Sequence, residues 1–364
     1  MELGKLELEN IVDNFKIIGT INESHPYGSG HINDSYRLVN SDRTKSDYLL
    51  QRINQNVFRD VDLTMNNILK VTRHINANSE NFRGSQQTLE LIPTITGTNY
   101  HRDTKGNYWR VYLFKKDLKS HDFVETSEQA YEGARAFGNF LKLLSDFPVS
   151  DIGYSIPDFH NIILRLETLK SVLGKGPTKR SIMAATDIKY IFSLSDEMSR
   201  IERLRISGNI PLRVTHNDTK FNNVLFDSQG KAVCVIDLDT VMPGVVHYDF
   251  GDGIRTATST AGEDEKDLSL IDVDMAKYEA FTSGYLDATR DILTPGEIEY
   301  LPLSGALFPY MMGVRFLTDF LNGDKYFKTE FTDHNLQRSR SQLQMTRMMI
   351  KKFPEIDKIV KSQV

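Results

Sequence analysis

The stretch VTHNDTKFNNVLFDSQGKAVCVIDLDT, residues 214–240, decides how this chain folds. Two short apolar runs, VLF and AVCVI, are separated by Asp227 and the turn-forming residues SQGK. Apolar runs joined by such a turn predict a short β-hairpin. Asp218, Asn223, Asp237 and Asp239 flank these runs, and the turn would bring Asn223 and Asp237 side by side. The sequence therefore predicts oxygen-bearing side chains at one end of the hairpin.

The polar residues of this stretch follow a spacing that has chemical meaning. His216-x-Asp218-x-x-x-x-Asn223 has the spacing of a kinase catalytic loop. Asp237 follows Asn223 by 14 positions (237 − 223). A lone cluster of Asp and Asn is most often turn chemistry. The ordered motif, the hairpin and the second Asp together favour phosphoryl transfer.

Phosphoryl transfer assigns a role to each of these residues. One carboxylate takes or orients the proton of the attacking hydroxyl, and oxygen ligands hold Mg²⁺ against the phosphates. We predict that Asp218 is the base and that Asn223 and Asp237 are metal ligands. Asp239 is expected either to assist at the metal or to support the ligands from behind.

Composition limits the classes of protein and partner. The chain has 364 residues, 40% of them hydrophobic and 26% charged, as expected for a globular protein with a sizeable core. A net charge of −5 argues against nucleic acid as the partner. No apolar run approaches the length of a membrane helix, about 18 residues. The single cysteine, Cys234, excludes an intrachain disulfide and a thiolate metal cluster.

The beginning of the sequence indicates the compartment. MELGKLELENIVDNF lacks the basic start and the apolar stretch of a signal peptide. We therefore expect a cytoplasmic protein without a membrane partner. We also expect it to act as a monomer.

The first part of the chain is strand-rich. Its apolar runs alternate with turn signals, and YGSG at residues 27–30 predicts a tight turn because glycine permits positive φ. The pattern predicts the order strand, glycine turn, strand, strand, helix, strand, strand. The expected strands are residues 14–21, 31–39, 47–53, 88–95 and 108–116, and the expected helix is 60–77.

The rest of the chain is mainly helical. Thr126 and Gln129 form a capping-box pattern before apolar residues at helical spacing. A second helix is predicted over residues 187–204. Another begins at Thr294 with Pro295 and Glu297 behind it. It ends at Asn322–Gly323, and Pro302 and Pro309 are expected to kink or divide it. We expect an N-terminal lobe of residues 1–117 and a C-terminal lobe of residues 118–364.

Longer strings carry a family resemblance. THNDTKFNNVLFD, VIDLDTVMPG and YDFGDGIR resemble the aminoglycoside phosphotransferase and choline kinase group of protein-kinase-like folds. YGSGHINDSY, LLQRIN, IPDFHN, DFGDGIRTATSTAGEDEKDLS and MGVRFLTDFLNGDKYFK resemble the N-acetylhexosamine 1-kinases over roughly residues 10 to 350. The resemblance implies an α+β bilobal fold with a β-rich N-lobe and a mainly helical C-lobe. It also implies Mg²⁺, ATP as phosphate donor, and transfer to the anomeric hydroxyl of N-acetylglucosamine or N-acetylgalactosamine.

The resemblance places the nucleotide in the N-lobe. The turn Gly28–Ser29–Gly30 would cover the phosphates through its backbone N–H groups. Arg52 stands where a kinase has its phosphate-binding lysine, and the following helix has no glutamate to pair with it. Arg52 is therefore either a phosphate ligand or a surface arginine. Leu113, in VYLFKKD, lies in the segment whose backbone would meet the adenine, or simply packs in a core strand.

The sugar site is expected at the other end of the pocket. Arg315 lies in an apolar helix, where an unpaired cation is costly, so it either pairs with Asp319 or faces the sugar and Asp218. The resemblance favours the second alternative. His31 and Asp34 follow the glycine turn and either reach the sugar or shape the turn.

Other polar residues of these strings have structural interpretations. His160 is expected to cap a helix or to lie in the core. Asp249 and Asp252 are expected to organise the catalytic segment through backbone hydrogen bonds and Arg255.

Two alternatives remain open from the sequence. One is another small-molecule kinase of the same fold, acting on an aminoglycoside, choline or a different sugar. The other is a catalytically dead kinase-like binding protein, which Asp218, Asn223 and Asp237 together argue against.

Overall fold

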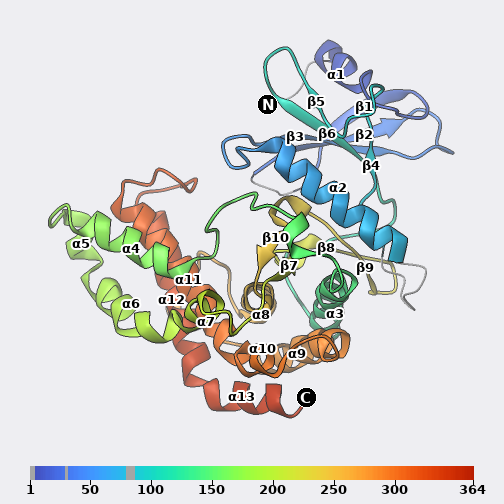
Figure 1. The fold of residues 1–364 in the computed structure, drawn as a ribbon. Helices are drawn as coiled ribbons and strands as arrows, with labels where there is room; N and C mark the ends of the chain where they lie inside the picture. The colour runs from blue at the N-terminus through green and yellow to red at the C-terminus, as the bar shows by residue number, and fades with distance from the viewer. Residues whose placement is uncertain (1–4, 29–31, 79–86) are drawn as a thin grey trace. The chain divides into compact units, whose positions relative to one another are not determined.

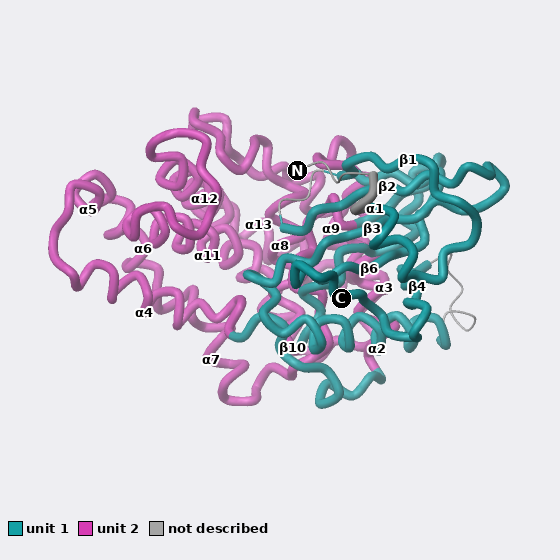
Figure 2. The backbone as a smooth tube through the Cα atoms, turned by 90° about the horizontal axis from the view of Figure 1, so that it is seen from above, with its two compact units in different colours: residues 1–120, 146–157, 224–242 teal, residues 121–145, 158–223, 243–364 magenta. Residues whose placement is uncertain are grey.

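The computed structural model describes residues 5–28, 32–78 and 87–364. The chain divides into two compact units, which Figure 2 shows in teal and magenta. The first unit contains residues 1–120, 146–157 and 224–242, and the second contains residues 121–145, 158–223 and 243–364. The lobe boundary between residues 117 and 118 stays a prediction.

An antiparallel sheet forms the centre of the first unit (Figure 1). Its strands follow the order β1-β2-β3-β6-β4, and β5 pairs with β6. The bounds are β1 Ile21–Pro26, β2 Asp34–Asn40, β3 Tyr48–Ile53, β4 Leu91–Ile92, β5 His101–Arg102 and β6 Tyr108–Leu113. The unit also contains helices α1 Lys5–Val12 and α2 Val61–Asn78.

The hydrophobic core of the first unit lies on one face of this sheet. Leu38, Leu50 and Val111 are fully buried on β2, β3 and β6, and Leu50 is the register partner of Val111. Leu8 and Ile11 of α1 belong to the same cluster. Side chains alternate between the two faces of a strand, so apolar residues at every second position are buried on one face of the sheet.

The first strand lies later than the sequence predicted. Residues 16–18 have no regular structure, and Phe15 makes a single β-bridge with Thr94. The strand is instead β1, Ile21–Pro26, with the polar sequence INESHP. Because β1 pairs only with β2 at the edge of the sheet, most of its side chains are exposed and no apolar alternation marks it.

The predicted hairpin is confirmed. β8 (Val224–Phe226) pairs antiparallel with β9 (Ala232–Val235), and Val224 is the register partner of Val235. The turn between them contains Gly230 with φ of 75°, a conformation that glycine adopts without a Cβ penalty. A one-turn 3-10 helix, η4 (Leu238–Thr240), follows β9.

Helices make up most of the second unit (Figure 1). The apolar α11 packs against α4, α8 and α12, and α3 packs against α9. The helices are α3 Ser127–Leu143, α4 Ile162–Leu173, α5 Lys179–Met183, α6 Ala185–Met198, α7 Arg200–Ile206, α8 Val246–Thr258, α9 Met275–Thr289, α10 Pro295–Glu299, α11 Leu301–Leu321, α12 His334–Lys351 and α13 Phe353–Lys361. Two short strands, β7 (Arg213–Thr215) and β10 (Met242–Gly244), pair with each other.

Helix starts and ends agree with the capping signals. The capping box at Thr126 is present, and so is the one at Thr294 with Pro295 in the first turn. Pro302 lies in the first turn of α11, which Tyr300 separates from α10, whereas Pro309 lies inside α11. The prediction of a single helix over residues 187–204 is wrong, because Ser199 interrupts the helix and separates α6 from α7.

The second unit also bears on the predicted fold class. A sheet-based unit and a helical unit make the protein α+β, as predicted.

Within the described residues, no helix is both long enough and apolar enough to cross a bilayer.

Candidate active site

The predicted catalytic loop leaves β7 through a strained backbone position. His216 follows Thr215, the last residue of β7, and Asn217 has φ of 63°. Asn tolerates this left-handed conformation better than most residues, because its short polar side chain can form local hydrogen bonds. The loop then passes Asp218 and enters the 3-10 turn η3, Phe221–Asn223.

A carboxylate on α8 holds this loop. The two oxygens of Asp249 accept the backbone N–H groups of His216 (2.9 Å) and Asn217 (2.7 Å). The Thr219 hydroxyl donates to the backbone carbonyl of Asp249 at 2.5 Å. Burial raises the pKa of Asp249 to about 6, although these N–H groups and His216 oppose the rise. The predicted backbone hydrogen bonds of Asp249 are confirmed.

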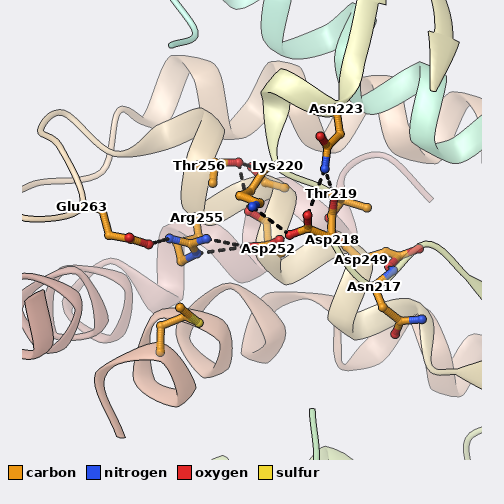
Figure 3. A network of polar contacts seen from close by, with 12 residues as sticks. Asn217, Asp218, Thr219, Lys220, Asn223, Asp249, Asp252, Arg255, Thr256 and Glu263 are labelled. Carbon is orange, nitrogen blue, oxygen red and sulfur yellow. Dashed lines mark hydrogen bonds and ion pairs between the residues drawn. The ribbon is translucent and has the colours of Figure 1, made fainter. Parts of the chain in front are cut away.

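Asp218 meets a cation and an amide donor (Figure 3). Its Oδ1 lies 3.2 Å from Lys220 Nζ, and its Oδ2 accepts Asn223 Nδ2 at 3.0 Å. Burial alone would raise the pKa of Asp218, but Lys220, His216 and the Asn223 hydrogen bond together lower it. The side chain keeps 20% of its surface exposed. Asp218 is therefore an ionised and accessible carboxylate at neutral pH.

His216 has a structural place in this loop. Its ring is fully buried and makes edge contacts with Phe137 and Phe140 of α3, with centroids 5.6 and 5.7 Å apart. Its Nδ1 accepts the backbone N–H of Asp218 at 3.3 Å. The histidine of the motif therefore anchors the loop to α3, and Asp218 keeps part of its side chain exposed to solvent.

A second charged cluster lies in the same network (Figure 3). Asp252 Oδ1 accepts Nε and Nη2 of Arg255 at 3.0 and 2.7 Å. The third guanidinium nitrogen, Nη1, donates to Glu263 at 3.0 Å. Burial raises the pKa of Asp252 and Arg255 opposes the rise, while the charge of Asp218 adds to it. The predicted Asp252–Arg255 interaction is confirmed.

The predicted metal ligands belong to different units. Asn223 contacts Asp218 in the second unit, whereas Asp237 and Asp239 follow β9 in the first. Asp237 has φ of 60°, and Asp239 is buried in η4. Within the described part of the chain, no group of three His, Cys, Asp or Glu residues could hold a metal ion. The predicted set includes an amide, so its role as a metal site stays a prediction.

The structure pairs two of the predicted ligand-binding residues. Arg52 and Asp34 are register partners on β3 and β2, and Arg52 Nε donates to Asp34 Oδ2 at 2.8 Å. The guanidinium also lies over the Trp109 ring, 5.9 Å from its centroid. Gly28 has φ of 85°, as a tight turn requires. The other predicted residues of the turn, Ser29, Gly30 and His31, lie outside the described residues.

Leu113 ends β6 at the predicted nucleotide-binding segment. Its backbone N–H donates to the Glu90 carbonyl at 2.9 Å, and the next N–H, of Phe114, donates to the Asp47 carbonyl at 3.0 Å. Both N–H groups are therefore satisfied within the first unit. The role of Leu113 towards a nucleotide stays a prediction.

Arg315 does not pair with Asp319. The Asp319 oxygens instead accept the backbone N–H groups of residues 325–327, each at 2.9 Å. The Arg315 guanidinium lies 5.4 Å from the Phe159 ring, 5.9 Å from Tyr326 and 5.5 Å from Phe327. No carboxylate among the described residues forms an ion pair with it. Its Nη1 donates to Met312 Sδ at 3.5 Å, so Arg315 is held by aromatic faces and one thioether, and its remaining N–H groups could serve a ligand.

His160 lies between the loop and this arginine. It is buried, and its Nε2 hydrogen-bonds the carbonyl of Asn217 at 2.9 Å. Burial and, to a smaller extent, the nearby charge of Arg315 lower the pKa of His160 to about 3. The prediction of a core histidine is confirmed, and its neutral ring supports the strained Asn217.

Sequence reasoning missed two residues of this region. Lys220 stands two positions after Asp218 in HNDTKFNN, so its place in the motif was a usable signal. Tyr326 keeps 64% of its surface exposed beside Arg315. Its place depends on the Asp319 hydrogen bonds, which no sequence pattern announces.

The chain is similar to known proteins in sequence and in fold. A family model described as "Phosphotransferase enzyme family" matches residues 23–281. An aminoglycoside phosphotransferase from Alicyclobacillus acidocaldarius superposes with a TM-score of 0.67 at 13% identity, over 99% of this chain and 98% of its own. A choline kinase from Cryptosporidium parvum gives 0.56 at 18% identity, over 91% and 90%. The amicoumacin kinase hAmiN gives 0.56 at 12% identity, over 92% and 88%.

These solved structures share the fold of this chain and confirm the predicted kinase-like α+β architecture. The family model covers more than half of the sequence. The chain belongs to the phosphotransferase enzyme family.

Proposed function

We propose that this phosphotransferase is an ATP-dependent small-molecule kinase that phosphorylates the anomeric hydroxyl of N-acetylhexosamines to give the sugar 1-phosphate. The observation that carries the proposal is Asp218, a low-pKa carboxylate on a loop fixed by Asp249. The resemblance of the flanking sequence strings to N-acetylhexosamine 1-kinases supplies the substrate.

Asp218 is suited to act as the base. Its ionised carboxylate can accept a hydrogen bond from the sugar hydroxyl and take its proton as the oxygen attacks the γ-phosphorus and the bond to the leaving ADP breaks. No covalent intermediate with the protein is needed. Lys220, 3.2 Å from Asp218, places a positive charge where negative charge develops on the transferred phosphoryl group.

The donor set fits a hard divalent cation. Asn223 Nδ2 is engaged by Asp218, so the amide oxygen is the atom left to bind a cation. Val224 pairs with Val235 at the open end of the hairpin, and the chain connects that end directly to Asn223 and, through Ile236, to Asp237. We propose that Asn223 and Asp237 hold Mg²⁺, which when bound neutralises phosphate charge. The similar amicoumacin kinase was solved with AMP-PNP and Ca²⁺.

The first unit would bind the nucleotide. The turn that contains Gly28 would cover the phosphates, and the segment at Leu113 would meet the adenine. Arg52 reaches a phosphate only if it turns away from Asp34, since both groups are already hydrogen-bonded to each other. This pair makes Arg52 the weakest member of the nucleotide set.

Arg315 and Tyr326 would recognise the sugar. An exposed aromatic face packs against a sugar ring, and a guanidinium donates to its hydroxyl or carbonyl oxygens. Burial and the nearby charge of Arg315 together lower the pKa of Arg165 to about 10, so the two guanidinium groups lie close to each other. Two neighbouring cations disfavour a polycationic aminoglycoside or a choline headgroup, so they support a neutral acceptor.

A substrate panel tests this proposal. We expect ATP consumption that depends on N-acetylglucosamine or N-acetylgalactosamine, with no turnover of kanamycin or choline. Turnover of kanamycin or choline but of no hexose would replace the sugar with the alternative substrate class. An ATP-dependent reaction with none of these compounds would contradict the proposed kinase activity.

A further inference from the structure

The Asp239 carboxylate is engaged within the first unit on both oxygens. Arg110 of β6 donates to both, with Nη1 to Oδ1 and with Nη2 to Oδ2 at 2.9 Å. Asn33 Nδ2 also donates to Oδ2, at 2.6 Å. The Arg110 and Asp239 side chains are only 1% and 2% exposed. This carboxylate is therefore neutralised in the interior before any ligand arrives.

If Asp239 turned away from Arg110 to bind a cation, the change would cost free energy. A buried guanidinium that loses its carboxylate becomes an uncompensated charge, which is among the most destabilising changes known in protein interiors. Burial opposes the charged form of Arg110, yet the carboxylate of Asp239 raises the pKa of Arg110 above its usual value. Asp239 is better placed to hold its neighbours than to bind a cation.

Further hydrogen bonds fix the backbone around Asp239. The Ser155 hydroxyl donates to the Asp239 carbonyl at 3.0 Å, and Asn67 Nδ2 of α2 donates to the Val241 carbonyl at 3.0 Å. Asp237 begins this segment with φ of 60°, a conformation that costs a non-glycine residue energy and persists only where its surroundings impose it. Residues 237–241 are therefore held in place by side chains of the same unit.

The same network reaches the residues that follow the glycine turn. Asn33 donates to Asp239 and accepts the backbone N–H of Asn54 through its Oδ1, at 2.9 Å. Gln51 of β3 accepts Nε and Nη2 of Arg110 at 3.0 and 2.9 Å. One carboxylate thus joins the segment after the turn, the central strands and the segment of Asp237.

We propose that Arg110 and Asn33 are positioning residues for the cation site, and that Asp239 is the brace through which they act and not a metal ligand. The brace sets the left-handed turn at Asp237 and couples it to the segment after the glycine turn. This inference rests on the proposed kinase function, because it takes Asp237 as a ligand of the nucleotide-bound cation.

The test measures Mn²⁺ binding in the presence of saturating ADP, by electron paramagnetic resonance, on the full chain. Arg110→Met and Asn33→Ala should weaken Mn²⁺ affinity, by roughly tenfold for Arg110→Met, because groups behind metal ligands typically contribute that much. Asn33→Ala removes one donor to Asp239 and the acceptor of the Asn54 N–H but leaves no buried charge unpaired, so it should fold even where Arg110→Met does not. Asp237→Asn provides the loss expected for a direct ligand.

Arg205→Met is the matched control. Arg205 of α7 donates to both oxygens of the buried Glu202, at 2.8 and 2.7 Å, as Arg110 does to Asp239, and neither residue belongs to the Asp239 network. Its removal should leave Mn²⁺ affinity within twofold of wild type. Thermal unfolding of every variant separates loss of the site from loss of the fold.

The possible results are distinct. Weaker Mn²⁺ binding in folded Arg110→Met and Asn33→Ala supports the brace. Wild-type affinity in both variants, with Asp239→Asn as damaging as Asp237→Asn, makes Asp239 a direct ligand and overturns it. Absence of ADP-dependent Mn²⁺ binding in the wild type overturns the proposed function, and the inference with it.

Discussion

Asp249 accepts the backbone N–H of Asn217 at 2.7 Å, although 32 residues separate them in sequence. This hydrogen bond holds a left-handed residue directly before the proposed base, Asp218. A buried carboxylate that accepts the N–H groups of both His216 and Asn217 thus fixes the loop without touching the substrate. Asp249 therefore holds the loop, whereas Asp218 is the group that would react.

Replacing the base tests its role directly. Asp218→Asn keeps the shape of the side chain and removes the negative charge. Turnover should fall by about 10³-fold, the usual contribution of a general base, while the unfolding temperature stays near that of wild type. Steady-state kinetics and thermal unfolding measure the two effects.

Asp196→Asn is the control for this substitution. Asp196 is an exposed carboxylate of α6 that pairs with Arg203, so the same change there should leave turnover unaltered. Near-normal rates in Asp218→Asn would show that another group takes the proton.

Lys220 should act on both the rate and the pH profile. Lys220→Met removes the cation beside Asp218, and we expect kcat to fall by about 10²-fold. Burial then raises the pKa of Asp218 with less opposition. In an Asp249→Asn background, which removes the titration of Asp249, the acidic limb of kcat/KM set by Asp218 should therefore move to higher pH. A pH–rate profile that keeps its position in that background would argue against this electrostatic contact.

Asp249 should produce opposite pH trends in activity and stability. Its folded pKa of about 6 lies above the ordinary aspartate value of 3.8, so the folded protein binds a proton that the unfolded chain has released between these values. The stability that this proton contributes is present below pH 3.8 and is lost as pH rises through about 6. The amount is roughly 3 kcal/mol. Activity should rise over the same window, because the ionised carboxylate accepts both N–H groups of the loop.

Asp249→Asn isolates these trends. In urea unfolding, the free energy of unfolding of the wild type should fall relative to that of the variant as pH rises from 4 to 6. The acidic limb near pH 6 should disappear from the kcat profile of the variant. An unchanged limb would assign that titration to another group.

Arg315 should affect the sugar more than the nucleotide. Arg315→Met removes donors to the sugar, and we expect the KM for N-acetylhexosamine to rise about tenfold, with little change for ATP. Stability should hardly change, since among the described residues no carboxylate depends on this arginine.

The control for Arg315 is Arg347→Met. Arg347 lies over Tyr190, 4.1 Å from its ring centroid, so it resembles Arg315 in its aromatic contact. Its loss should leave both KM values unchanged. Equal effects of the two substitutions would reduce the role of Arg315 to packing.

Local signals in the sequence predicted much of this structure. The capping box at Thr126 and the turn between β8 and β9 depend on neighbours in the chain, and both are confirmed. The spacing of His216, Asp218 and Asn223 identified the loop for the same reason. Such features follow from short-range rules of hydrogen bonding and backbone geometry.

Long-range pairings could not be predicted. Arg110 and Asp239 are 129 residues apart, and only the folded sheet brings them together. Helical spacing offered Asp319 as one possible partner of Arg315, but backbone N–H groups from residues 325–327 bind Asp319 instead. The edge strand β1 lacks an apolar pattern because one of its sides has no partner strand. Each of these depends on tertiary contacts.

The position of the phosphate on the product tests the central claim most directly. The protein is incubated with ATP, Mg²⁺ and N-acetylglucosamine or N-acetylgalactosamine, and the product is examined by ³¹P and ¹H NMR. The account predicts a phosphate monoester whose phosphorus couples to the anomeric proton. A phosphate on the primary hydroxyl, or no phosphorylated hexose with either sugar, would contradict it.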